Sequence, residues 1–291
     1  MAGLTLGQIL DFLAAPFVAS LILTGIHSYL GVHVVERGVI FVDLSLAQIA
    51  ALGATIAVLL PFSAGDPHAP SVYWVSLLFT FIGAAIFSTI RGKSSRIPQE
   101  AIIGISYAVA SAAAILAMSK STSESEHLKD MLVGNILAVS WHEVGTTALL
   151  YGVVGAFHYV FRKQFLTISM NHNDVESTGL NVRWWDFLFY ASFGFVVTSS
   201  VAIAGVLLVF CYLIVPSVAA MLFADTIGKR LAIGWTMGTI VSALGVYLSL
   251  ILDLPTGATI VCTFGCVLIL MAIVRAIIPR RVAPQVGFRA A

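Results

Sequence analysis

Charged residues are scarce in this chain, whose 291 residues include only 10% Asp, Glu, Lys and Arg. Hydrophobic residues make up 59%, and the mean hydropathy is +0.99. Soluble domains carry about a quarter charged residues, so the composition excludes a water-soluble protein. The formal net charge of +1 lacks the excess of basic residues that nucleic-acid binding needs. The hydrophobic composition instead predicts a protein surrounded by lipid.

Sequence motifs of catalysis are also missing. The chain has no Walker-type phosphate loop, no Gly-rich phosphate cradle, no Ser-His-Asp pattern and no zinc-protease pattern. Its three cysteines lie in apolar stretches, and an odd number there argues against a disulfide framework. Cys262 and Cys266 are one helical turn apart, a spacing that fits a metal pair but more often reflects packing. We therefore expect no enzyme and no cofactor on this chain, so that any transport is driven by an ion gradient or a partner subunit.

Nine apolar stretches fill most of the sequence. Most approach the ~20 residues that a helix needs to cross a bilayer, where only helices and closed barrels satisfy their backbone groups. The predicted fold is an all-α polytopic transmembrane bundle of about eight or nine spans, forming a single membrane domain over 1–291. Two stretches follow one another almost without a loop, so one broken or re-entrant helix would lower the count. The predicted spans are 14–34, 39–60, 72–90, 101–118, 141–161, 186–204, 206–224, 231–252 and 258–278.

Basic residues indicate how the chain is oriented. If the connections alternate sides, one side receives 13 of the 15 Lys and Arg residues, and the other only Lys120 and Lys129. The positive-inside rule makes the first side cytoplasmic. We expect a multi-pass protein of the cytoplasmic membrane with its N-terminus outside and its C-terminus inside. The basic residues on the cytoplasmic side are Arg37, Arg91, Lys93, Arg96, Arg162, Lys163, Arg183, Lys229, Arg230, Arg275, Arg280, Arg281 and Arg289.

A few polar residues fall at membrane depth, where ionisable groups are costly and point to function. Asp43, one turn into the second span, is a candidate to bind a cation or gate the exit; alternatively it reaches the interface or pairs with Arg37. Gln48 shares a helix face with Ser45 rather than with Asp43, a pairing that fits ligand contact or helix packing.

Two further residues are candidates for the pathway. His27, in the middle of the first span, is a possible metal ligand, although a lone histidine there is more often hydrogen-bonded within the bundle. His33 and His158, near cytoplasmic ends, are expected at the interface. Pro216 is expected to kink its span, and kinked helices often flank substrate paths.

The longest cytoplasmic connection covers 162–185. Within it, Asn173-Asp-Val-Glu-Ser-Thr-Gly has an Asn able to cap a short helix, acidic residues in the first turn and a Gly to end it. Such a helix on the cytoplasmic face could receive force from an external motor. The alternative is a surface loop that only joins two spans.

Five segments in order resemble the permease subunit of the zinc/manganese class of ABC importers. They are Gly205-Val-Leu-Leu-Val with its break at Pro216, Asp253-Leu-Pro-Thr-Gly-Ala, Val133-Gly-Asn-Ile-Leu, Glu100-Ala-Ile-Ile-Gly, and the region from Asn171 to Leu180. The resemblance implies a dimer of two permease copies, cytoplasmic ATPase subunits that use ATP, and an extracytoplasmic substrate-binding protein. It also implies that the coupling contact to the ATPase involves Asn171, Asn173, Asp174, Glu176 and Gly179.

The second span departs from the pattern of that family. Family members usually place an Asp and a His one turn apart there to hold the cation, and the matching positions here are Leu44 and Gln48. The resemblance predicts import of a divalent metal such as zinc, manganese or iron. The departure leaves open a chelated metal or a small organic ligand on the same scaffold. A gradient-driven secondary carrier is the further alternative.

Overall fold

The computed structural model describes residues 6–61, 69–90, 98–119, 136–170 and 179–278. These residues are helical and contain no strand, which confirms the predicted all-α fold. The helices are α1 (Leu6–Glu36), α2 (Val42–Leu59), α3 (Pro70–Ile90), α4 (Gln99–Met118), the 3-10 turn η2 (Ile136–Ala138), α6 (Trp141–Val160), α7 (Arg162–Met170), α8 (Val182–Met221), α9 (Ile227–Leu252) and α10 (Thr256–Ile277).

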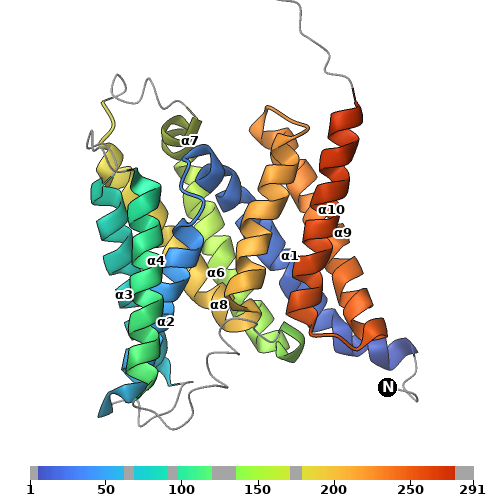
Figure 1. Ribbon diagram of the computed structural model, residues 1–291, viewed down its shortest axis with the longest axis horizontal. Helices are drawn as coiled ribbons and strands as arrows, with labels where there is room; N and C mark the ends of the chain where they lie inside the picture. The colour runs from blue at the N-terminus through green and yellow to red at the C-terminus, as the bar shows by residue number, and fades with distance from the viewer. Residues whose placement is uncertain (1–5, 62–68, 91–97, 120–135, 171–178, 279–291) are drawn as a thin grey trace, which may run out of the picture.

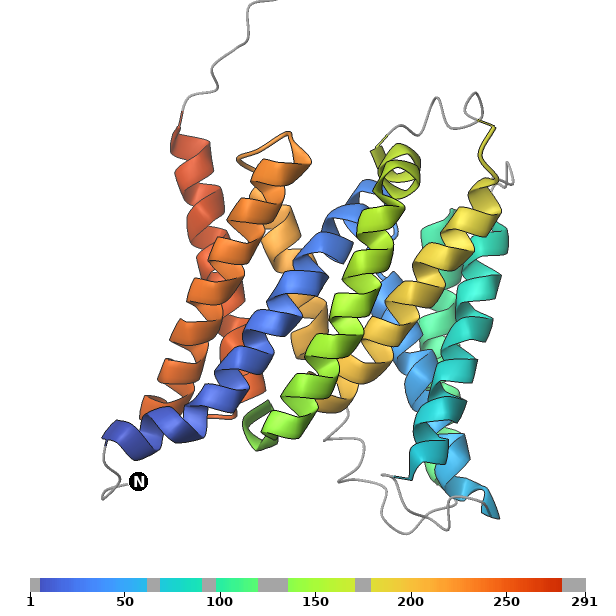
Figure 2. The ribbon, with the colours of Figure 1, turned by 180° about the vertical axis from the view of Figure 1, so that it is seen from behind.

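The long helices run between two edges of the bundle (Figure 1). The N-terminal end of α1 lies at the lower edge, and the end of α10 lies at the upper edge together with α7. We call this upper edge the α7 edge. The ends of α1 and α8 and the start of α9 also reach it, as the reverse view confirms (Figure 2).

Seven helices of the described part are long and apolar enough to cross a membrane, and an eighth span results if α6 and α7, bent by 75°, count together. The difference from the nine predicted spans arises mainly in α8. The stretches 186–204 and 206–224 both fall on this one helix, which is broken at Gly205 (φ 74°, ψ 161°). A broken helix was the alternative that the sequence left open. The two arms of α8 both run to the α7 edge, so each follows the bundle direction separately (Figures 1 and 2).

Helix ends follow local sequence signals. Ser140 and Glu143 form a reciprocal capping box at the start of α6, in which Ser140 N donates to Glu143 Oε2 at 2.8 Å. This explains the acidic residue at that position without a role in transport. Glu100, in the first turn of α4, accepts through its Oε1 from the backbone N–H of Phe41 at 3.0 Å and so links α4 to the start of α2.

Small residues let the central helices approach closely. A Cβ atom at Gly31 of α1 would overlap the carbonyl oxygen of Leu213 and the hydroxyl of Ser217 on α8. At Gly53 of α2, a Cβ would lie 2.9 Å from Phe79 Cβ on α3. Close backbone approach at glycine is typical of membrane helix packing, where van der Waals contact replaces the hydrophobic drive. These contacts place α8 at the centre of the bundle, against α1 on one side and α2 and α3 on the other.

Candidate functional site

The predicted pathway residues on α2 lie inside the protein. Asp43 and Ser45 have side chains that are 1% and 0% exposed, and Gln48 is 9% exposed. Within the described residues, Asp43 Oδ1 and Ser45 Oγ have no hydrogen-bond partner. Asp43 neither reaches the interface nor pairs with Arg37, so both of those alternatives are wrong. An incompletely paired buried carboxylate is costly and calls for an explanation, and handling of a cation remains a prediction for it.

His27 is held within the bundle. Its Nδ1 is hydrogen-bonded to the carbonyl oxygen of Leu23 at 2.8 Å, and its ring meets Tyr151 of α6 edge-on at 6.1 Å. Its Nε2 has no partner among the described residues. In that part of the chain no three His, Cys, Asp or Glu side chains come together as a metal site. His27 and Asp43, the two predicted metal ligands, therefore belong to no such three-residue group among the described residues, and their metal-binding role stays a prediction.

The break in α8 lies at Gly205, eleven residues before the predicted kink at Pro216. Backbone angles at Pro216 are helical, and its buried ring lies near Gly234 of α9. The break falls at the junction of the predicted stretches 186–204 and 206–224, where a broken helix was one of the alternatives, because glycine reaches a backbone region that other residues avoid.

The connection over 162–185 contains a short helix that sequence reasoning missed. α7 occupies 162–170, immediately after α6, and exposes Arg162 and Lys163 while burying Phe165, Ile168 and Ser169. The predicted coupling residues Asn171, Asn173, Asp174 and Glu176 lie outside the described residues. Gly179 is exposed with φ +68°, which suits glycine at a turn, and Asn181 then caps α8 by accepting from Trp184 N.

A buried polar cluster that sequence reasoning missed lies at the α7 edge. Arg37 Nη1 forms an ion pair with Asp186 Oδ1 at 2.7 Å, and both side chains are 0% exposed. Arg37 Nε donates to Ser169 Oγ at 2.9 Å, and the guanidinium lies 3.9 Å from the ring centroid of Phe189. His33 Nδ1 is hydrogen-bonded to the same Ser169 hydroxyl at 2.8 Å. The cluster thus joins α1, α7 and α8.

Histidines at this edge are not interfacial, contrary to the prediction. His33 and His158 are 0% and 1% exposed. His158 is hydrogen-bonded to Ser192 at 2.8 Å and stacks on Phe165 of α7 at 4.4 Å. Both imidazoles meet the ring of Tyr29 edge-on. The sequence places them near span ends, but only the tertiary structure shows that α7 folds back over them.

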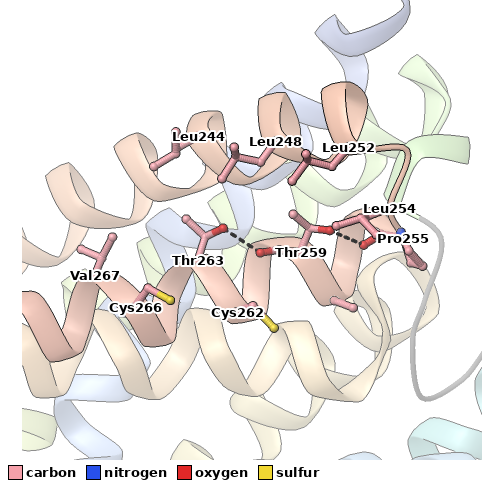
Figure 3. A pocket seen from close by; sticks show the side chains of 11 residues that line it. Leu244, Leu248, Leu252, Leu254, Pro255, Thr259, Cys262, Thr263, Cys266 and Val267 are labelled. Atoms are coloured by element: carbon pink, nitrogen blue, oxygen red, sulfur yellow. Dashed lines mark hydrogen bonds between the residues drawn. The ribbon is translucent and has the colours of Figure 1, made fainter. Parts of the chain in front are cut away.

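Two apolar pockets lie along α9 and α10, away from the predicted pathway residues. One has a volume of about 470 Å³ and the other about 430 Å³, and both are lined by Leu244 and Val267. In the first, Leu244, Leu248 and Leu252 project from α9 towards α10 (Figure 3). The hydroxyls of Thr259 and Thr263 bond to carbonyls of the preceding turn, so neither offers a free donor to a ligand. Cys262 and Cys266 are free thiols in the same lining.

The long apolar helices of the described residues define a polytopic, all-α membrane protein. The sequence pattern of the ABC 3 transport family matches residues 9–275, and the chain belongs to that family.

Similar proteins are found among bacterial transport systems. The manganese transport system membrane protein MntC of Listeria innocua is 30% identical over 188 residues, which cover 62% of this chain and 67% of that protein. A probable iron transport system membrane protein of Haemophilus influenzae is 24% identical over 263 residues, or 90% of this chain and 89% of that one. Among solved structures, PsaBC from Streptococcus pneumoniae in complex with Fab has a TM-score of 0.75 and 21% identity, covering 92% of this chain and 95% of that one. This likeness confirms the predicted fold.

Proposed function

We propose that this chain is the permease subunit of an ABC importer that carries a divalent metal ion, such as manganese, iron or zinc, across the cytoplasmic membrane. The observation that carries the proposal is the family match over 9–275, together with relatives named for manganese and iron transport. ATP hydrolysis takes place on a separate ATPase subunit. An extracytoplasmic binding protein delivers the cargo, and two permease copies form the pathway within a single membrane domain each.

The α7 edge faces the cytoplasm in this proposal. All Lys and Arg residues of the described ranges lie on elements that reach this edge, in agreement with the positive-inside rule. The N-terminus is then outside and the end of α10 inside. The ATPase docks on α7 and the segment that follows it, because α7 lies at that edge and exposes Arg162 and Lys163 there.

Leu44 and Gln48 support a second cargo on the same scaffold. Neither side chain offers the carboxylate or imidazole that divalent metals prefer, and an amide ligand is a weak substitute. A chelated metal or small organic ligand needs hydrogen bonds and apolar contact instead, which these two residues provide.

The first experiment is purification of the protein from its native membrane in mild detergent, followed by mass spectrometry of its partners and elemental analysis. A stoichiometric ATPase with manganese, iron or zinc supports the proposed importer. An ATPase without metal favours the second cargo. An intact permease dimer without any ATPase contradicts the proposal and favours a gradient-driven carrier.

Asp43→Asn is expected to lower metal uptake by about ten- to a hundredfold, the range found when a group that supports a metal site is lost. The substitution keeps the size of the side chain but removes its charge. Uptake of radioactive manganese into proteoliposomes, at matched protein content, measures the effect. Thr55→Val is the matched control, because Thr55 is a buried polar residue of the same helix that bonds only to the carbonyl of Ala51. Equal uptake by Asp43→Asn and wild type, across several cations, removes Asp43 from the pathway.

Reversing the charges of Asp174 and Glu176 to Lys is expected to lower transport per ATP hydrolysed by about fivefold or more, the range of a coupling free energy between two sites. Both acids belong to the proposed docking segment. ATP hydrolysis and uptake are measured together in proteoliposomes holding the full complex. Asp225→Lys, an exposed acid in the turn between α8 and α9, controls for charge at the same edge. An unchanged transport-to-hydrolysis ratio rules out docking through these two residues.

A further inference from the structure

The end of α1 is held rigidly by a backbone motif. Gly38 has φ +66°, and its N–H donates to Val35 O at 3.1 Å, while Val39 N donates to Val34 O at 3.2 Å. These two bonds form a Schellman motif, which ends a helix and fixes the direction of its last residues. The side chains of Glu36 and Arg37 therefore leave a fixed turn, which we call the α1 end (residues 36–39).

Glu36 and Arg37 contact opposite parts of the bundle. Arg37 binds Asp186 at the start of α8 and Ser169 of α7. Glu36 pairs with Arg230 in the first turn of α9, and Arg230 also donates to the carbonyl of Ala224, between α8 and α9. Two consecutive residues of opposite charge thus connect the α7 side of the bundle with the α9 side.

The two ion pairs differ in exposure. The Arg37–Asp186 side chains are both 0% exposed, whereas those of Arg230 and Glu36 are 13% and 25% exposed. A fully buried pair cannot open without leaving a charge unpaired in protein, while a solvent-accessible pair exchanges its partner for water at small cost. The first contact is therefore the more costly to break, and the second opens and closes more easily.

We propose that the α1 end transmits movement of α7 to α9, with Arg37–Asp186–Ser169 as the fixed joint and Glu36–Arg230 as a contact that opens and closes in each transport cycle. The inference rests on the proposed function, since α7 moves when the ATPase docks and closes. Arg37, Asp186, Glu36 and Arg230 are positioning residues: they set the relative placement of three helices and touch no cargo. Figure 2 shows α7 lying over the end of α1 at the same edge as the turn that precedes α9.

The test uses charge reversal at the labile pair in the full complex. Glu36→Arg and Arg230→Glu are each expected to reduce transport per ATP hydrolysed by about two- to fivefold, the scale of a partly exposed ion pair. The double variant restores the opposite charges and is expected to recover the ratio to within about twofold. Lys229→Glu, an exposed neighbour on α9, is the matched control and leaves the ratio unchanged. A ratio that is unaffected by either single variant, or not recovered by the double variant, overturns the proposal.

A second measurement uses the permease alone and requires neither cargo nor ATPase. Spin labels at Lys163→Cys on α7 and Lys229→Cys on α9, with Cys262 and Cys266 replaced by Ser, report the distance between the two helices. We expect one narrow distance distribution in the parent protein, a broader one with Glu36→Arg, and a narrow one again with Glu36→Arg and Arg230→Glu together. An unchanged distribution in Glu36→Arg overturns the mechanical link. If the unaltered complex hydrolyses ATP without any uptake of metal or metal chelate, the proposed function fails instead. The distance measurements still test whether Glu36 and Arg230 connect α7 with α9, because they use the permease alone.

Discussion

Replacement of Asp186 with leucine is expected to lower the free energy of unfolding by about 3–5 kcal/mol, the cost of leaving a buried charge without its partner. Arg37 is buried, and its guanidinium would lose the carboxylate that lies 2.7 Å from it. Two of its other contacts, the Ser169 hydroxyl and the ring of Phe189, carry no full negative charge. Thermal unfolding of the purified permease, followed as loss of the monodisperse peak after heating, measures the change.

The double variant Arg37→Met with Asp186→Leu distinguishes the effect of an unpaired buried charge from the effect of losing the ion pair itself. Replacement of both charges by apolar groups of similar volume is often neutral or stabilising, so we expect most of the lost stability to return. Asp225→Leu, at an exposed position of the same edge, controls for the change of residue type and is expected to have an effect within about 0.5 kcal/mol. Wild-type stability in the Asp186→Leu single variant would show that the pair does not hold α1 against α8.

Gly205→Val is expected to reduce the yield of folded protein sharply, through a strain of about 1–3 kcal/mol at one residue and the repacking that follows. At φ 74° and ψ 161° the backbone of Gly205 lies in a region that is essentially restricted to glycine. A β-branched residue favours continuation of the helix or an extended chain, and either choice separates the two arms of α8 from their neighbours. Size-exclusion analysis of detergent extracts, at equal expression, measures the folded fraction.

Gly152→Ala provides the control for the Gly205 substitution. Gly152 lies within α6, and a Cβ atom there would meet no other atom within 4 Å. Alanine in a helix interior is favoured over glycine by about 1 kcal/mol, so this variant should fold as well as the parent or better. Equal yields of Gly205→Val and Gly152→Ala would mean that the break in α8 does not depend on the conformational freedom of glycine.

Hydropathy locates most of the spans well because it reports a property of each segment by itself. The stretch 101–118 corresponds to Gln99–Met118, and 72–90 to Pro70–Ile90. The two predicted stretches 186–204 and 206–224 meet at Gly205, and they correspond to the two arms of α8, each of which runs to the α7 edge. Hydropathy fails where the structure depends on a distant partner.

The candidate site was only partly predictable for the same reason. Burial of His27 follows from its depth in an apolar run, and the structure confirms it, whereas for Asp43 the sequence left an interfacial position open. The pairing of Arg37 with Asp186 joins residues 149 positions apart, and no local pattern in a single sequence reports such a contact. The helix that the capping signal at Asn173 predicts lies outside the described residues, and α7, at 162–170, was not predicted.

The first helix of the chain bears on how the protein assembles in the membrane. α1 buries Ser20, Thr24, His27 and Ser28, and it packs mainly against α8 and α9, which are among the last helices to be synthesised. During translation α1 therefore enters the bilayer without the neighbours that later cover its polar side chains. Until then, these polar side chains of α1 must contact water, the insertion machinery or transient protein partners. The bundle is complete only when the C-terminal third of the chain has been synthesised and α8 and α9 pack against α1.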